Sequence, residues 1–220
     1  MVRLGLLPPV TLDDVKAAYR DQAKRDHPDH GGSVEDFQSL HEAFKQAQEY
    51  VAFHGDRRQW IAKRMDGYLS FRELMERLEE FGAEATSNTI DWIEKSVGDF
   101  AQLTETIIGI RLENSPAADE MIRLLVDKKS LLGELTCLEL PGCQVSDEGV
   151  LLLEPFQLLK QLDLTSTPVT SKALPVVEMI PALESIELKG SRVGWWRRLR
   201  VEKVMRQRRE AVPPTLFSEA

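Results

Sequence analysis

His27 and Asp29 are the residues of this chain whose types and spacing come closest to acid–base chemistry. An imidazole beside a carboxylate can act as a general base that the carboxylate orients. Catalysis by such a pair also needs a nucleophile nearby, and the neighbouring sequence supplies none. Pro28, which lies between them, limits the freedom of the backbone. We therefore do not expect this pair to be catalytic.

The two cysteines, Cys137 and Cys143, are the other candidates for chemistry. Six residues apart, they fit neither a disulfide scaffold nor a four-ligand zinc site. We expect Cys137 to fill space on a sheet and Cys143 to be buried. The sequence contains no nucleophile–base pair, phosphate-binding loop or cluster of metal ligands. We therefore expect that the protein is not an enzyme and that it binds no cofactor or metal.

Two helices must position the His27 tripeptide, one on each side of it. The first begins at Thr11, with Asp14 three residues later in a capping pattern, and ends near Asp26, because the residue before a proline avoids helical angles. The second begins at Ser33 and keeps an apolar face as far as Val51. One face of the first helix is basic, with Lys16, Arg20 and Lys24 at positions i, i+4 and i+8.

This helical hairpin resembles the J-domain of DnaJ-type co-chaperones over roughly residues 3–55. The resemblance rests on linked motifs: Leu4-Gly5-Leu6, Tyr19-Arg20, Ala23, His27-Pro28-Asp29, Phe37 and Glu42-Ala43-Phe44. It implies that the domain docks on a DnaK-type chaperone and stimulates the ATPase of that partner. The residues implied in docking are His27, Pro28, Asp29, Lys16, Arg20, Lys24 and Arg25. In this interpretation the basic side chains steer association with an acidic surface, and Asp29 accepts hydrogen bonds from an arginine of the chaperone.

The chain departs from the family pattern in two respects. Only four residues precede Gly5, so either the natural start lies upstream or the domain packs with two long helices. The family's Gly/Phe-rich linker and Cys-rich zinc repeats do not occur in the sequence. The sequence therefore gives no basis for assigning client binding of the family's standard kind.

A period of 24 residues runs through the C-terminal half of the sequence, which indicates a repeat structure. Four apolar columns share it: Leu135, Leu159 and Leu183; Leu138, Leu162 and Ile186; Leu140, Leu164 and Leu188; Val145, Val169 and Val193. An earlier unit with the same pattern lies 28 residues upstream, at residues 107–114. The template Leu-x-x-Leu-x-Leu followed by a polar turn resembles the leucine-rich repeat family. That resemblance implies a solenoid with a short parallel sheet, which serves in protein interaction.

The side chains between these leucines are expected on the open, concave face of the sheet, because side chains alternate along a strand. One predicted column contains Cys137, Gln161 and Ser185, and the other contains Arg111, Glu139, Asp163 and Glu187. Carboxylates ~4.8 Å apart on adjacent strands repel each other unless a basic side chain nearby compensates their charge. Three interpretations stay open: a solvated acidic face; a binding surface for a basic segment of a partner or, less favoured, for the chain's own residues 197–209; and a metal site, disfavoured because no histidine joins the column.

Charge is divided unevenly along the 220 residues, whose net charge is −8. Residues 1–65 carry no net charge, residues 66–190 carry −13 and residues 191–220 carry +5. The acidic centre argues against wholesale nucleic-acid binding, and no apolar stretch is long enough to span a membrane. The basic tail, which includes Trp195 and Trp196, is expected to cap the solenoid; the alternatives are an anionic membrane surface and a nucleic acid.

The sequence as a whole predicts a mixed α and α/β protein. The expected parts are a J-domain over 1–55, a helical bridge over 56–106, about four leucine-rich repeats with a basic helical cap over 107–212, and a frayed tail over 213–220. No signal peptide is recognised at the start, so a cytoplasmic location is expected. The expected function is that of a DnaJ-like co-chaperone whose repeats choose the protein acted on. The alternative is a non-catalytic adaptor in which the J-like domain is only structural.

Overall fold

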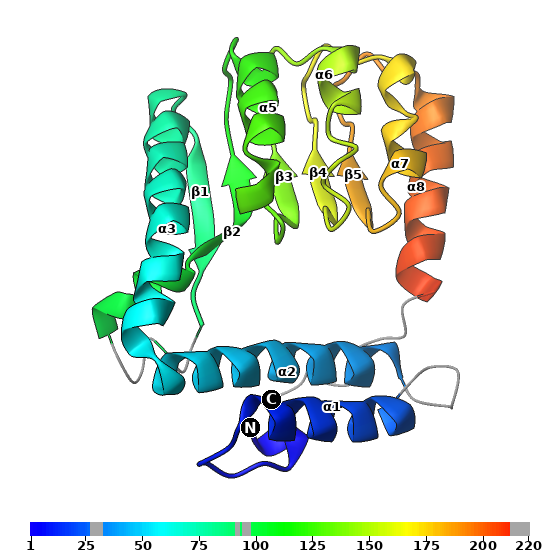
Figure 1. The fold of residues 1–220 in the computed structure, drawn as a ribbon. Helices are drawn as coiled ribbons and strands as arrows, with labels where there is room; N and C mark the ends of the chain where they lie inside the picture. Colours follow the sequence, from blue (N-terminus) through cyan, green and yellow to red (C-terminus); the bar gives the residue numbers. More distant parts are fainter. Residues whose placement is uncertain (27–32, 91–92, 94–97, 212–220) are drawn as a thin grey trace. The chain divides into compact units, whose positions relative to one another are not determined.

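The chain folds as a mixed α/β protein with a five-stranded, mostly parallel sheet (Figure 1). The computed structural model describes residues 1–26, 33–90, 93 and 98–211. The chain divides into two compact units, residues 1–66 and 67–214, and the boundary in the sequence falls within helix α3 (Arg57–Glu80).

Unit 1 contains the predicted pair of helices, α1 (Leu12–Asp26) and α2 (Val34–Gly55), which follow a single 3-10 turn, η1 (Val2–Leu4). The capping pattern predicted at Thr11 and Asp14 is confirmed. The Asp14 N–H donates to Thr11 Oγ1 at 3.2 Å, and the Thr11 N–H donates to Asp14 Oδ2 at 2.9 Å. Ser33 caps α2 by accepting a hydrogen bond from the Asp36 N–H at 2.9 Å. These caps satisfy backbone donors that the first turn of a helix leaves without partners.

The core of the hairpin is small and joins η1, α1 and α2. Its fully buried members are Leu4, Val15, Leu40 and Ala47. Tyr19 stacks on Phe44 with ring centroids 4.2 Å apart. Leu12, at the start of α1, is 39% exposed and is not part of this core. In place of a long first helix, η1 supplies Leu4 to the core.

The segment predicted as a helical bridge, residues 56–106, is only partly helical. Helix α3 ends near Gly82, whose φ of +75° allows the chain to turn, and strand β1 (Glu84–Asn88) follows. A 3-10 helix, η3 (Gly98–Thr104), leads to the next strand. Residues 91–92 and 94–97 of this segment lie outside the described residues. Trp60 is a packing residue, since it is 5% exposed and its Nε1–H donates to Glu49 Oε2 at 2.9 Å.

The sheet of unit 2 has the order β1-β2-β3-β4-β5. Strand β2 (Thr106–Arg111) pairs antiparallel with β1, and the others follow it in parallel: β3 (Cys137–Glu139), β4 (Gln161–Asp163) and β5 (Ser185–Glu187). The connections between the parallel strands form short helical elements: α5 (Ala118–Asp127), η4 (Lys129–Leu131), α6 (Asp147–Leu151), η5 (Ser171–Ala173) and α7 (Val176–Met179). The apolar columns predicted from the 24-residue period are buried between these elements and the sheet.

The turn after each parallel strand repeats the same unusual backbone conformation. Asn114, Gly142, Ser166 and Gly190 have φ values of +50°, +70°, +57° and +77°. The spacings between them, 28, 24 and 24 residues, are those of the sequence repeat. The turns stack closely, since a Cβ on Gly142 would lie 2.1 Å from Asn114 Oδ1. Glycine is therefore needed at that position for its φ and for the close approach of its neighbour.

Polar side chains tie consecutive connections together on the helical side. Asp119 Oδ1 accepts a hydrogen bond from the Ser146 N–H at 2.9 Å. One repeat later, Asp147 Oδ1 accepts from the Thr170 N–H at 2.6 Å. Ser146 and Thr170 in turn accept hydrogen bonds from the first turns of α6 and η5. An aspartate of each repeat thus binds the residue that caps the helical element of the next repeat.

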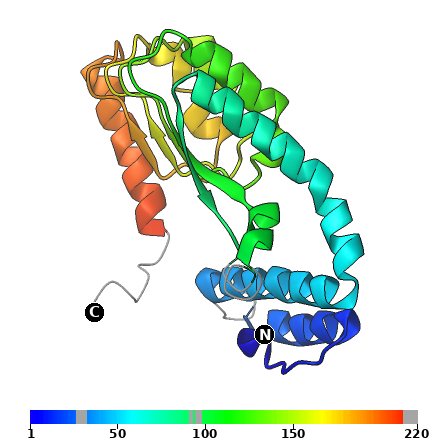
Figure 2. The same ribbon diagram turned by 90° about the vertical axis from the view of Figure 1, so that its left-hand side faces the viewer.

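Helix α8 (Trp195–Ala211) packs beside β5 at the end of the sheet. Its buried side chains are Val201 and Met205. Arg208 donates hydrogen bonds to the carbonyl oxygens of Val177, Ile180 and Leu183 at 2.7, 3.1 and 3.0 Å. Figure 2 shows α5 and α8 on opposite sides of the sheet. Helix α8 therefore closes the β5 end, as expected of the predicted cap, and the expected tail over 213–220 lies outside the described residues.

Candidate functional site

The open face of the sheet, on the side away from α5, carries two columns of side chains in the predicted register. Arg111, Glu139, Asp163 and Glu187 are aligned across the four parallel strands, as are Gly109, Cys137, Gln161 and Ser185. The residues between the columns, Ile110, Leu138, Leu162 and Ile186, are buried on the other side. Paired positions on consecutive strands are 28, 24 and 24 residues apart, which are the spacings of the sequence repeat, so the repeat predicts this register.

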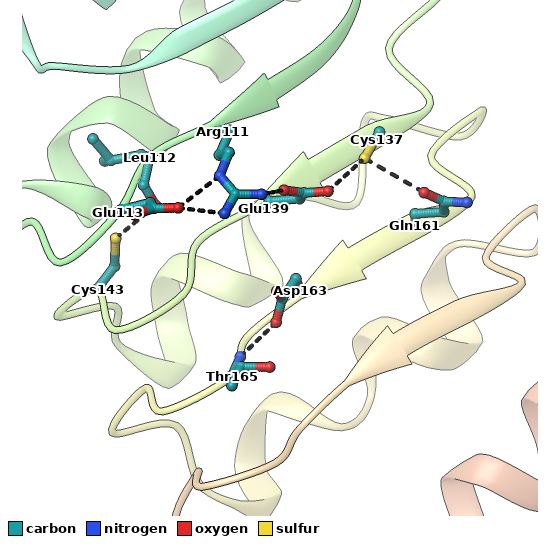
Figure 3. A network of polar contacts seen from close by, with 9 residues as sticks. All are labelled: Arg111, Leu112, Glu113, Cys137, Glu139, Cys143, Gln161, Asp163 and Thr165. Carbon is teal, nitrogen blue, oxygen red and sulfur yellow. Dashed lines mark hydrogen bonds and ion pairs between the residues drawn. The ribbon is translucent and has the colours of Figure 1, made fainter.

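Arg111 binds two carboxylates of this face (Figure 3). Its Nη1 lies 2.5 Å from Glu139 Oε2, and its Nε donates to Glu113 Oε1 at 2.7 Å. The hydrogen bond with Glu113, its charge and the bond with Glu139 raise the pKa of Arg111 above its usual value. The expected ladder of three repelling carboxylates therefore has a base at one end. Glu139 is paired, and among the described residues Asp163 and Glu187 are the carboxylates of the column without an ion-pair partner.

Asp163 and Glu187 differ in their surroundings. Asp163 Oδ1 accepts a hydrogen bond from the Thr165 N–H at 2.7 Å, so the strand's own turn orients this carboxylate (Figure 3). Glu187 is exposed and lines a groove of about 470 Å³ between β5 and α8, together with Lys203, Arg206 and Arg209. In the less favoured expectation, the chain's own residues 197–209 bind the acidic face. In the structure, basic residues of this stretch lie beside the acidic column only at β5, where they line the same groove as Glu187.

Strand β1 adds residues to this face that sequence reasoning did not select. Glu84 pairs with Arg111 and Thr86 pairs with Gly109 in the antiparallel register. These residues and Cys137 line a hollow of about 230 Å³ on the open face. A Cβ added to Gly109 would make only ordinary contacts, at 3.6 Å from the Cβ atoms of Thr86 and Cys137.

Neither cysteine is activated as a nucleophile. Burial, followed by the charge of Glu139, raises the pKa of the Cys137 thiol, so the thiolate is disfavoured at neutral pH. The Cys137 Sγ lies 3.7 Å from Glu139 Oε1 and 3.6 Å from Gln161 Oε1. Cys143 is fully buried, as predicted, and its thiol donates to the Leu112 carbonyl oxygen at 3.1 Å. Within the described ranges, no group of three or more histidine, cysteine or acidic residues is arranged to hold a metal ion.

The second candidate surface is the exposed basic side of α1 in unit 1. Lys16, Arg20, Lys24 and Arg25 are all exposed, and none of them forms an ion pair with another described residue. Arg3 binds Asp26 at the end of α1 at 2.9 Å, which attaches η1 to that end of the helix. The tripeptide His27, Pro28 and Asp29 follows directly, but it lies outside the described residues.

Comparison of the chain with models of known protein families, with curated proteins and with solved structures gave no match. The class defined by the structure is therefore a mixed α/β protein with a helical hairpin and a five-stranded, mostly parallel sheet. None of the helices in the described part of the chain is long and apolar enough to cross a lipid bilayer.

Proposed function

We propose that this protein is a co-chaperone of the DnaJ type, in which residues 1–55 recruit a DnaK-type chaperone and stimulate its ATPase. The sheet-bearing unit binds the protein on which the pair acts. The observation that carries the proposal is the basic face of α1, where Lys16, Arg20, Lys24 and Arg25 are exposed and lead towards the His27 tripeptide. Two capped helices that share a common core support the same interpretation.

The physical role of α1 in this proposal is to steer association. Exposed basic side chains on one helix face attract an acidic partner surface and accelerate encounter, and salt weakens this effect. The resemblance assigns contact with the chaperone to His27, Pro28 and Asp29, and Asp29 would accept charge-assisted hydrogen bonds. The chemistry itself belongs to the ATPase, so this chain needs neither a nucleophile nor a cofactor for the proposed activity.

The steady-state ATPase rate of a DnaK-type chaperone, measured with and without the full-length protein, tests this proposal. We expect stimulation by the wild type and its loss in His27→Gln. The matched control is His54→Gln, which changes an exposed imidazole at the far end of α2 and should stimulate normally. No stimulation by the wild-type protein with any chaperone from the same cell would favour the alternative, an adaptor whose J-like domain is only structural.

Charge reversal separates steering from docking at the loop. In Arg20→Glu/Lys24→Glu, association with the chaperone should slow, most strongly at low salt. The control Arg58→Glu/Lys63→Glu makes the same change in net charge at exposed positions of α3 and should associate at the wild-type rate. Equal rates for both variants would show that net charge, and not the α1 face, governs association.

A partner surface on the open face is the second part of the proposal. Asp163 and Glu187 remain without a basic side chain bound to them in the described part of the chain, and a hollow opens beside Glu139. An extended basic segment that crosses the strands would contact these carboxylates in succession, at intervals of ~4.8 Å. The residues that we propose for this contact are Glu139, Asp163 and Glu187.

A further inference from the structure

Helix α8 presents two faces with different environments. Val201 and Met205 are buried against the rest of unit 2, and Arg208 reaches back to three carbonyl oxygens. Its first two turns carry three exposed apolar side chains, since Trp195, Trp196 and Leu199 are 54%, 71% and 49% exposed. The inward face of α8 covers the β5 end of the sheet. Three large exposed apolar side chains close together on the same helix are not needed for that packing and require another explanation.

Arginines surround these apolar side chains. Arg197 and Arg200 are exposed on the same two turns, and residues 188–201 contain no acidic residue. Trp195 and Trp196 stack with ring centroids 3.7 Å apart, so that the two indoles form one wedge. We call Trp195, Trp196, Arg197, Leu199 and Arg200 the α8 tip.

We infer that the α8 tip docks the protein on an anionic lipid surface. Indole rings favour the boundary between headgroups and acyl chains, because they combine an apolar body with a polar N–H. Leu199 adds apolar area to the wedge, and the arginines contact lipid phosphates. The contact is peripheral, and it involves the face of α8 that the fold leaves exposed.

The same observations favour lipid over a nucleic acid. Bases bind single-stranded-DNA-binding surfaces by stacking on free aromatic faces, but Trp195 and Trp196 each use one face on the other ring. Glu187 and Glu202 line the groove of about 350 Å³ beside Trp195, so a strand that followed α8 would pass two carboxylates. Trp195 and Leu199 also line this groove, whereas Trp196, Arg197 and Arg200 do not, so a flat lipid surface can contact these three side chains without entering the groove. Pairing of two tips in a dimer would bring like-charged arginines together, which is also unfavourable.

Flotation of the full-length protein with vesicles tests this inference. We expect the wild type to float with phosphatidylcholine vesicles that contain phosphatidylserine, and to stay unbound with phosphatidylcholine alone. Each arginine near an anionic surface contributes about a five-fold gain in partitioning, so Arg197→Gln/Arg200→Gln should lower binding roughly 25-fold. Trp195→Ser/Trp196→Ser should lower it by at least about ten-fold, because the apolar wedge is removed.

Matched variants elsewhere in unit 2 provide the controls. Arg72→Gln/Arg123→Gln removes two exposed arginines, and Leu158→Ser replaces a leucine that is 53% exposed, so neither should change flotation. Leu199→Ser should reduce it. Circular dichroism and the unfolding midpoint report on folding, and the arginine variant alters only exposed side chains, so it keeps the test informative if the tryptophan variant unfolds.

Three outcomes would overturn the inference. The first is that the wild type does not float with phosphatidylserine vesicles even at low ionic strength. The second is that the Arg72/Arg123 control loses binding as strongly as the tip variant, which would make the effect one of net charge. The third is that the protein binds a single-stranded oligonucleotide but not vesicles and loses that binding in the tip variants, which would assign the tip to nucleic acid.

Discussion

Replacing Arg111 by glutamine should strengthen the binding of basic peptides to the open face. In the structure the Arg111 guanidinium binds Glu113 and Glu139 at once, and it lies at the end of the column that continues through Asp163 and Glu187. It therefore competes with any basic ligand for these carboxylates. Removing it is the one change of a charged residue in this column for which we expect a gain in affinity.

The magnitude follows from the number of carboxylates released. A contact between unit charges ~4 Å apart in water contributes about 1 kcal/mol, which corresponds to roughly a five-fold change in Kd. Glu139 lies in the column itself, whereas Glu113 lies beyond the end of β2, so a lysine of the peptide reaches Glu139 more directly. We expect about a five-fold tighter Kd in Arg111→Gln, and only a small loss of stability because the pair is exposed.

Fluorescence anisotropy with a short peptide of alternating lysine and serine measures this effect. The matched control is Arg123→Gln, which makes the same change in net charge at an exposed position on α5, on the helical side of the sheet. The difference between the variants should shrink as salt rises above about 0.15 M, because exposed charges are screened beyond ~8 Å. Unchanged or weaker binding in Arg111→Gln, or an equal gain in the control, would refute the assignment of Arg111 as a competitor.

Three further predictions concern the sheet and its end. Gly149→Ala should destabilise unit 2 by about 1–2 kcal/mol, measured by urea titration with hydrogen exchange as the readout. The new Cβ would lie 2.1 Å from Asp119 Oδ1, and this overpacking outweighs the gain in helix propensity. Arg208→Met should destabilise the β5 end by roughly 2–4 kcal/mol, seen as faster exchange of β5 amides, because three carbonyl oxygens lose a charged donor. Cys137 should react slowly with iodoacetamide at neutral pH and faster as pH rises, and Glu139→Gln should speed the reaction because removing that charge lowers the pKa of the thiol. The glycine and arginine controls carry the same substitutions at the exposed positions Gly133 and Arg209.

The register of the open face could be predicted from the sequence because it follows the spacing of the repeat. Residues one repeat apart, 28 from β2 to β3 and 24 thereafter, occupy equivalent places, so the column of Glu139, Asp163 and Glu187 follows by counting. The period also predicts where the chain turns after each parallel strand. The residues that occupy those turns vary between glycine, asparagine and serine, so residue type alone does not reveal that they share a positive φ.

Two features of the candidate site could not be predicted in this way. Strand β1 has the sequence Glu84-Ala-Thr-Ser-Asn88, in which no alternation of large apolar residues indicates a strand, and it forms by pairing with the free edge of β2. The contact between Arg111 and Glu139 depends on side-chain conformation. A signal for it was present, since Arg111 precedes Glu139 by one 28-residue unit, but spacing does not distinguish an ion pair from two separate charges.

The charge of α8 shows why a net count along the sequence is not a surface property. Residues 191–220 carry a net charge of +5. However, Arg208 donates hydrogen bonds to backbone carbonyl oxygens, and Arg198 lies 3.5 Å from the Leu188 carbonyl oxygen. These two side chains stabilise the end of the sheet, so they add little to the attraction of a partner. The outward charge at the start of the helix is that of Arg197 and Arg200, beside the exposed tryptophans. Capping and docking therefore use different arginines of one helix, and substitutions at the two sets should affect stability and binding separately.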